Sequence, residues 1–222
     1  MSGTLPTTPG MASAVWRSQW PGLQAQTDIG ATQRVNYLGH FFEVDVTYPL
    51  LKRSTAKPII GFLQQQQGAY DNFSAGITGY TNVDGAVYDR HLAVGPSGTN
   101  QISTEINVAS TNLVGVSSVN YTSNFTSTYY NNSTHGDFFI VGDIVRFSNH
   151  NKLYMITQQT NPDSAGAGNI RILPTLTTQI DATTDIYYYN VYGNWFLKNT
   201  DISWNAGLSD TTELAFTLRE DV

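Results

Sequence analysis

The chain has 222 residues and no Cys, and its 11 basic and 17 acidic side chains give a formal net charge of −6. Disulfides, thiolate nucleophiles and thiolate metal sites are therefore excluded, and the absence of a Lys/Arg cluster removes the electrostatic footprint of a nucleic-acid-binding protein. No apolar run approaches the ~18 residues of a membrane span. Residues 1–10 lack a basic n-region and an apolar h-region, so we expect a soluble protein made in a cytoplasm, without a membrane partner.

The polar residues of this chain are mostly uncharged. Charged residues make up 13% of the chain, about half of the ~25% found in ordinary soluble domains. Thr, Asn, Ser and Gln supply 74 of the 222 residues. Because Thr and aromatic residues favour strands and Gly and Asn favour tight turns, this composition predicts a β-rich fold. A surface so poor in charge is typical of proteins that are largely covered by neighbouring subunits.

Residues 1–30 are predicted to form an extended N-terminal arm. The Pro residues at 6 and 9 prevent a helix there, because Pro removes a backbone donor and restricts the residue before it. Trp16, Trp20 and Leu23 are the large apolar anchors of the arm. Two interpretations remain open: the arm packs back on its own domain, or it docks on a partner subunit through its Trp side chains.

The next elements follow from periodicity. Residues 42–48 alternate apolar and polar side chains, which predicts a half-buried strand. A short helix is expected at about 54–67, capped by Ser54 or Thr55 and ended near Gly68. A strand follows at 70–73, and strands are also expected at 101–108 and 112–116 within a loop-rich insertion at about 76–135. The polar segment 117–135 is predicted to be an exposed loop or edge hairpin.

The stretch 137–173 is the most regular, and it predicts a meander of short strands with tight turns. Four further strands are expected at 185–191, 195–197, 202–204 and 214–218. Short strands at this spacing, with one helix, predict a mainly β fold that is either a β-barrel or a β-sandwich. We therefore expect a single β-barrel-like domain over 31–222, preceded by the arm.

No pattern of catalytic, cofactor-binding or metal-binding residues is found. The four His residues, at 40, 91, 135 and 150, are isolated in sequence, whereas a metal site needs several ligands converging in space. Nucleophile-elbow, dinucleotide and phosphate-loop motifs are absent. Glu43 and Asp45 are a carboxylate pair that a glycosidase could use, although a solvated strand face explains them as well. We expect no enzyme activity and no cofactor.

Aromatic side chains offer a second interpretation. Tyr187, Tyr188 and Tyr189 place rings on both faces of one strand, and the segment 120–132 is rich in Tyr and Asn. Sugars stack on exposed aromatic rings, so these residues could form a carbohydrate-binding surface on a receptor-binding tail protein. The alternative is a strand that is buried on one face and covered by a neighbouring element on the other.

Several short motifs, in order, resemble those of tailed-bacteriophage virion structural proteins of the distal-tail type, close to the baseplate hub. They are a strand ending in Tyr-Pro-Leu, a helix ending in Phe-Leu, a Gly-Ala-Tyr-Asp-Asn-Phe strand, a Gly-Asp hairpin and the closing strands, at residues 33–50, 59–63, 68–73, 141–156 and 194–220. The family usually has a basic residue between the helix and the next strand, where this chain has Gln66-Gln67-Gly68. Residues 76–135 are insertion-like in this comparison.

The resemblance implies a structural protein of the virion tail, assembled in the host cytoplasm. Such proteins form a homo-oligomeric ring, usually a hexamer, that joins the tail tube to baseplate, hub or fibre proteins. DNA would pass through this ring without specific binding, which suits an acidic protein. The expected assembly contacts are Trp16, Trp20, Leu23, Tyr129 and Tyr130. On this basis, deleting residues 1–30 is expected to leave a folded domain and to block tail assembly.

Overall fold

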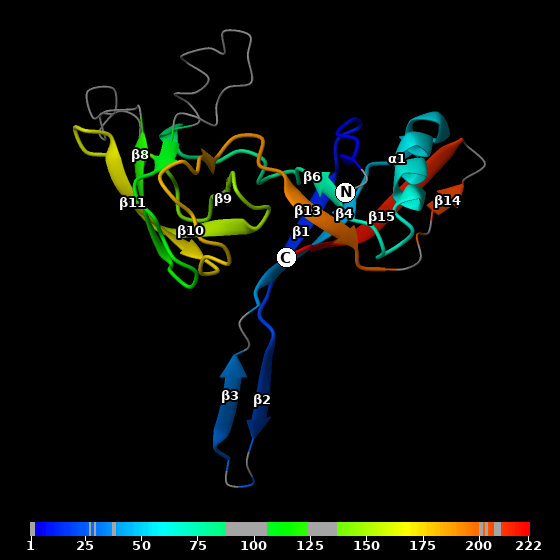
Figure 1. The fold of residues 1–222 in the computed structure, drawn as a ribbon. Helices are drawn as coiled ribbons and strands as arrows, with labels where there is room; N and C mark the ends of the chain where they lie inside the picture. The colour runs from blue at the N-terminus through cyan, green and yellow to red at the C-terminus, as the bar shows by residue number, and fades with distance from the viewer. Residues whose placement is uncertain are drawn as a thin grey trace. The chain divides into compact units, whose positions relative to one another are not determined.

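The computed structural model describes residues 3–26, 28, 30–36, 39–87, 106–123, 137–199, 202, 204–206 and 210–222. The fold is mainly β with one helix, as expected from the sequence, and it includes a nearly closed, barrel-like sheet (Figure 1). The chain divides into two compact units, residues 1–75 with 194–222 and residues 76–193. The structure therefore differs from the single domain expected over 31–222, because residues 76–193 have a core of their own instead of decorating one barrel.

The first unit is built on a seven-stranded sheet whose main path is β1-β4-β15-β13-β6, with β5 and β14 also pairing with β15. Antiparallel pairing joins β1 to β4 over seven residues, and β4 to β15 over five. The strands of this unit are β1 (Ser13–Gln19), β4 (Phe41–Thr47), β5 (Leu51–Lys52), β6 (Phe73–Ala75), β13 (Gly193–Leu197), β14 (Trp204–Ala206) and β15 (Thr211–Glu220).

One face of this sheet forms the core of the first unit. Alternate residues of β15 point inward and are buried, as are alternate residues of β4. The helix α1 (Arg53–Gln65) contacts β5 and β15 (Figure 1) and buries Ala56, Ile59 and Leu63. The helix lies where it was predicted, but Lys52 is its N-cap residue and no side chain caps it. The prediction of a Ser54 or Thr55 cap was wrong, because the helix already begins at Arg53.

The N-terminal residues are part of this unit instead of forming an arm over 1–30. Residues 3–5 run beside β6, where the Leu5 N–H donates to the Ser74 carbonyl at 2.9 Å. The Leu5 side chain is buried, and β1 forms a full strand of the sheet. A separate two-stranded ribbon, β2 (Gly22–Gln26) and β3 (Thr32–Asn36), follows β1 (Figure 1). We call residues 22–36 the ribbon.

The second unit is a six-stranded sheet in the order β12-β9-β10-β11-β8-β7. A bridge between Asn107 and Asp185 and the hydrogen bond from the Val108 N–H to the Thr184 carbonyl link β7 to the segment beside β12. The sheet thus nearly closes on itself and hides its edges. Its strands are β7 (Ile106–Val108), β8 (Ser118–Ser123), β9 (Ile144–Phe147), β10 (Leu153–Thr160), β11 (Ala167–Leu173) and β12 (Ile186–Tyr187).

The predicted meander over 137–173 is confirmed as β9, β10 and β11. The expected loop over 117–135 is wrong in its first part, because Ser118–Ser123 forms β8 between β11 and β7. Val119 and Tyr121 point into the core, while Asn120 and Thr122 face solvent. The strand expected at 112–116 is instead a turn beyond the bridge at Asn112. Residues 124–136 and 88–105 lie outside the described residues.

His150 links the stability of the second unit to pH. Its Nε2 is 2.8 Å from the Tyr154 hydroxyl, and burial, followed by Arg146 and Lys152, lowers its pKa to about 4. Because this pKa lies below the unfolded value of about 6.5, the unfolded chain binds more protons between these two values. The contribution of His150 to the free energy of unfolding is therefore fully present above pH 6.5 and is lost as the pH is lowered toward 4. Because the His150 ring is partly exposed, we expect this loss to be about 1–2 kcal/mol.

This dependence is measured by following thermal unfolding by circular dichroism between pH 7.5 and pH 4.5. His150→Gln removes the titrating group, and its amide retains a hydrogen-bonding partner for Tyr154. The other titrating groups are common to both proteins, so we expect the variant to lose less stability than the wild type on acidification. Parallel pH profiles would show that His150 does not bind protons differently in the two states.

Candidate functional site

The two edges of the seven-stranded sheet differ. At β6 the edge is covered by residues 3–5. At the other end, β1 is the last strand of the path, and within the described part of the chain no strand pairs with its outer side. Its seven-residue register with β4 is unbroken, and Arg17 is its one charged residue. Long, regular edges without Pro, Lys or a bulge accept a further strand readily.

The ribbon directly follows the edge strand β1 in the chain, and its described side chains are exposed. All five side-chain positions of β2 are exposed, as are those of Thr32–Val35 in β3. Leu23 pairs directly with Val35 across the ribbon, and these side chains are 58% and 52% exposed. An isolated two-stranded hairpin is marginally stable in water. A second surface that covers the apolar pair would therefore stabilise the ribbon by removing this pair from water. We call residues 13–36, which comprise β1 and the ribbon, the open segment.

The base of the ribbon is held by a small aromatic cluster. The His40 ring lies 4.7 Å from Trp20 and 4.6 Å from Phe42, measured between ring centroids. The Ser18 hydroxyl lies 2.7 Å from His40 Nε2. His40 is buried, while Trp20 is 43% exposed. The ribbon thus leaves the sheet from a packed point of attachment beside the ends of β1 and β4.

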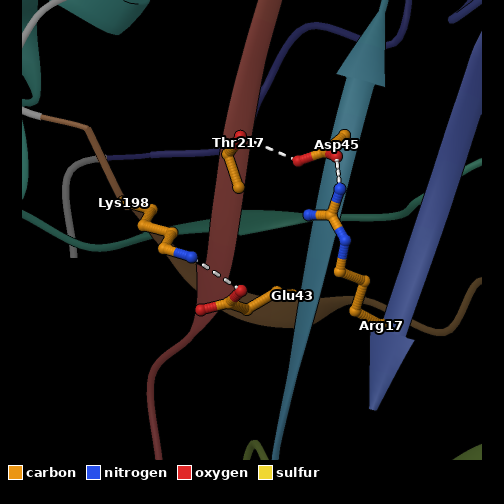
Figure 2. A network of polar contacts seen from close by, with 5 residues as sticks. All are labelled: Arg17, Glu43, Asp45, Lys198 and Thr217. Carbon is orange, nitrogen blue, oxygen red and sulfur yellow. Dashed lines mark hydrogen bonds and ion pairs between the residues drawn. The ribbon is translucent and has the colours of Figure 1, made fainter. Parts of the chain in front are cut away.

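The outer face of the sheet carries a network of charged side chains (Figure 2). Lys198 Nζ donates to Glu43 at 2.8 Å, and the Glu43 side chain is only 5% exposed. Arg17 donates to Asp45, which also accepts a hydrogen bond from the Thr217 hydroxyl at 2.8 Å (Figure 2). The two cations therefore neutralise the two carboxylates across three strands and the end of a fourth.

These contacts determine what Glu43 and Asp45 can do chemically. The hydrogen bond from Arg17 is the largest cause that lowers the pKa of Asp45, so this carboxyl group stays ionised at neutral pH and is poorly suited to donate a proton. A retaining or inverting glycosidase needs a carboxyl group that is protonated when the substrate binds. The contacts of the two carboxylates are those of a cross-strand network in the sheet.

Within the described ranges, no three His, Asp or Glu side chains are grouped so that they could hold a metal ion. No helix among those residues is both long and apolar enough to cross a membrane. The prediction that the chain needs no cofactor remains a prediction.

The predicted assembly residues have different surroundings. Trp16 is partly buried, and its ring packs edge-on against Phe42 and Trp195 at 5.7 and 5.8 Å. The interpretation in which the arm packs back on its own domain thus describes Trp16, whereas Trp20 and Leu23 keep exposed surface. Tyr129 and Tyr130 lie outside the described residues. Whether any of these side chains contacts a partner stays a prediction.

The proposed carbohydrate platform is not an exposed row of rings. Tyr188 is buried in the core of the second unit, and Tyr189 packs against that core. The guanidinium of Arg146 lies over the Tyr187 ring at 4.8 Å. These three rings have little exposed face for a sugar, and most of the other predicted contributor, 120–132, lies outside the described residues.

Two surfaces were missed by sequence reasoning. Val35 was not singled out, although the alternation of Leu23 and Ala25 with Gln24 and Gln26, and the Asp28-to-Gly30 turn signal, could have shown a hairpin. The second surface is a groove where β14 pairs with β15, with a volume of about 560 Å³. Exposed Leu50 and Trp204 line this groove, together with Glu213. Its residues come from separate parts of the chain, so no local sequence pattern predicts this groove.

Comparisons with known protein families and curated proteins identify no relative of this chain. No protein-family model matches the chain, and no curated protein matches its sequence. The residues and geometry described above therefore carry the functional inference.

Proposed function

We propose that this chain is a structural component of a bacteriophage tail, which forms a homo-oligomeric ring at the tube end and joins it to baseplate, hub or fibre proteins. The observation that carries the proposal is the open segment: an edge strand whose outer side meets no strand within the described residues, followed by a ribbon whose described side chains are exposed. Both features are unfavourable in an isolated monomer and favourable once a neighbouring subunit covers them.

The contrast between the two units supports this role. The second unit nearly closes its sheet and protects its edges, whereas the first unit leaves one edge open while covering the other with residues 3–5. An evolved monomer would be expected to protect both edges. The low content of charged residues, 13%, also suits a protein surrounded by neighbours.

Many kinds of assembly could cover the open segment. We place the chain in a phage tail because the order of its short motifs resembles that of distal-tail proteins. In that setting the net charge of −6 would help DNA to slide through the ring, since phosphates and carboxylates repel each other. The proposed partners are copies of the same chain, tail-tube protein and hub or baseplate proteins, and the proposed location is the virion tail.

Negative-stain electron microscopy of the purified protein, alone and mixed with its neighbouring tail proteins, tests this function. We expect closed rings with a central channel wide enough for duplex DNA, and attachment of these rings to tube ends. Monomers under both conditions would contradict the proposal. Rings that bind no tube would support assembly but overturn the place in the tail.

A further inference from the structure

The groove beside Trp204 is a second unusual surface of the first unit. Leu50 and Trp204 line it and are 63% and 47% exposed, although both are large apolar side chains. Leu214 adds a buried apolar floor, and Glu213 adds one exposed carboxylate. The groove therefore combines polar surface with two exposed large apolar side chains, and Glu213 is its one acidic side chain.

The ribbon has the complementary properties. Leu23 and Val35 form an exposed apolar pair on one face, and Arg34 is the one charged side chain within β2 and β3. Arg34 is exposed and next to Val35 in sequence, so it projects from the opposite face of the ribbon, and its long side chain reaches the rim of a surface on which the apolar pair rests by bending around the ribbon edge. The apolar pair can cover the exposed Leu50 and Trp204 side chains of the groove, and the one cation of the ribbon is opposite in charge to its one carboxylate.

The strand register shows that the ribbon and the groove belong to opposite ends of β4. Gln19, the last residue of β1, pairs with Phe41 at the start of β4, so the ribbon is attached there. The groove is lined by Thr47, at the other end of β4. Seven residues of strand span roughly 20 Å. The exposed side chains of the ribbon also show that it does not occupy the groove of its own chain.

We infer that the groove beside Trp204 receives the ribbon of a second copy of this chain, with Leu23 and Val35 against Leu50 and Trp204 and with Arg34 beside Glu213. Because the two surfaces differ and lie at opposite ends of one strand, the contact is head-to-tail and repeats from copy to copy. Head-to-tail contacts generate closed rings when the rotation between copies closes. This inference rests on the proposed function and names the contact through which the ring forms.

Directed crosslinking tests the contact, since the chain contains no Cys and any disulfide must come from introduced residues. Leu23→Cys and Leu50→Cys proteins are made separately, mixed and oxidised. We expect a covalent heterodimer in the mixture, exceeding the homodimers that each protein forms alone. Leu113→Cys is the matched control, because Leu113 is also 63% exposed but belongs to the second unit. Its mixture with Leu23→Cys is expected to give no such product.

A charge exchange tests the same contact without a crosslink. Arg34→Glu and Glu213→Arg are each expected to weaken self-association by about tenfold, and the double variant is expected to recover most of it. Both positions are exposed, so the variants should fold, which circular dichroism checks.

The outcomes separate this inference from the proposed function. Rings that form without the 23–50 crosslink and without rescue by the double variant would overturn the ribbon-in-groove contact and leave the ring itself intact. A protein that remains monomeric at all concentrations would overturn both. Selective protection of Trp204 fluorescence by a tail-tube protein or a glycan, with no effect of a second copy, would assign the groove to that other occupant and likewise overturn the inference.

Discussion

Gly85→Ala is expected to destabilise the second unit by about 3 kcal/mol or more. A Cβ atom at position 85 would lie 2.3 Å from the Phe138 carbonyl oxygen and 2.8 Å from the Phe139 Cα. Both neighbours are backbone atoms, which cannot rotate away as the end of a side chain could. The same segment is held by hydrogen bonds from the Ala86 and Val87 N–H groups to the carbonyls of residues 137 and 138. A shift large enough to admit a methyl group would break this docking and disturb the core.

Gly61→Ala is the control for this substitution. A Cβ at position 61 meets no atom within 4 Å, and Gly61 lies inside α1, so the change is expected to be neutral or to stabilise by up to about 1 kcal/mol. Urea unfolding followed by circular dichroism measures both variants. All four Trp residues belong to the first unit, so their fluorescence reports that unit alone. A Gly85→Ala protein as stable as the wild type would refute the close approach.

Lys198→Met is expected to destabilise the first unit by about 2–3 kcal/mol. The Glu43 side chain is 5% exposed and its carboxylate is paired with Lys198 at 2.8 Å. Removing the cation leaves a buried carboxylate without its charged partner, which costs more than an exposed ion pair contributes. The figure is at the low end for buried pairs because the Lys198 side chain itself is 45% exposed. Trp fluorescence during urea unfolding measures the change.

Two matched variants identify the cause of that loss. Adding Glu43→Gln to Lys198→Met removes the uncompensated charge and should restore much of the stability. Arg17→Met breaks the neighbouring pair, where Asp45 is 33% exposed and keeps the Thr217 hydrogen bond, so a much smaller loss is expected. Equal losses for Lys198→Met and Arg17→Met, or no recovery in the double variant, would show that burial of Glu43 is not the cause.

Regular local patterns made much of the fold predictable from sequence. The meander over 137–173 has short strands separated by strong turn signals, and the helix has apolar residues at helical spacing, so both were found. The polar composition of Ser118–Ser123 predicts a loop. Its alternation places only Val119, Tyr121 and the small Ser123 inward, and the pairing with β11 and β7 that makes it a strand comes from distant residues.

The N-terminal segment shows why the candidate site was only partly predictable. The sequence predicts Trp16, Trp20 and Leu23 as assembly contacts because they are large apolar side chains, but their surroundings depend on β4, β13 and the ribbon. Trp16 packs against Phe42 and Trp195 from distant strands, whereas Leu23 has only its ribbon partner Val35 opposite it. Deleting residues 1–30 would therefore remove β1 and Trp16 from the first unit, and it is not a clean test of assembly.

The strand register provides a better deletion. Gln19 and Phe41 pair directly at the ends of β1 and β4, so removal of residues 22–38 leaves Trp20-Pro21-Gly39-His40 as a four-residue connection. Pro followed by Gly is a favoured pair in tight turns, and hairpin loops of this length are common. The sheet and the Trp20–His40 contact are expected to remain.

Sedimentation velocity of the wild type beside the protein lacking residues 22–38 tests whether the chain assembles through its open segment. We predict that the wild type sediments as a closed oligomer, while the deletion protein remains monomeric, with unchanged Trp fluorescence and thermal stability in its folded state. Oligomers of the same size from both proteins, or wild-type protein that stays monomeric over the whole concentration range, would contradict the account.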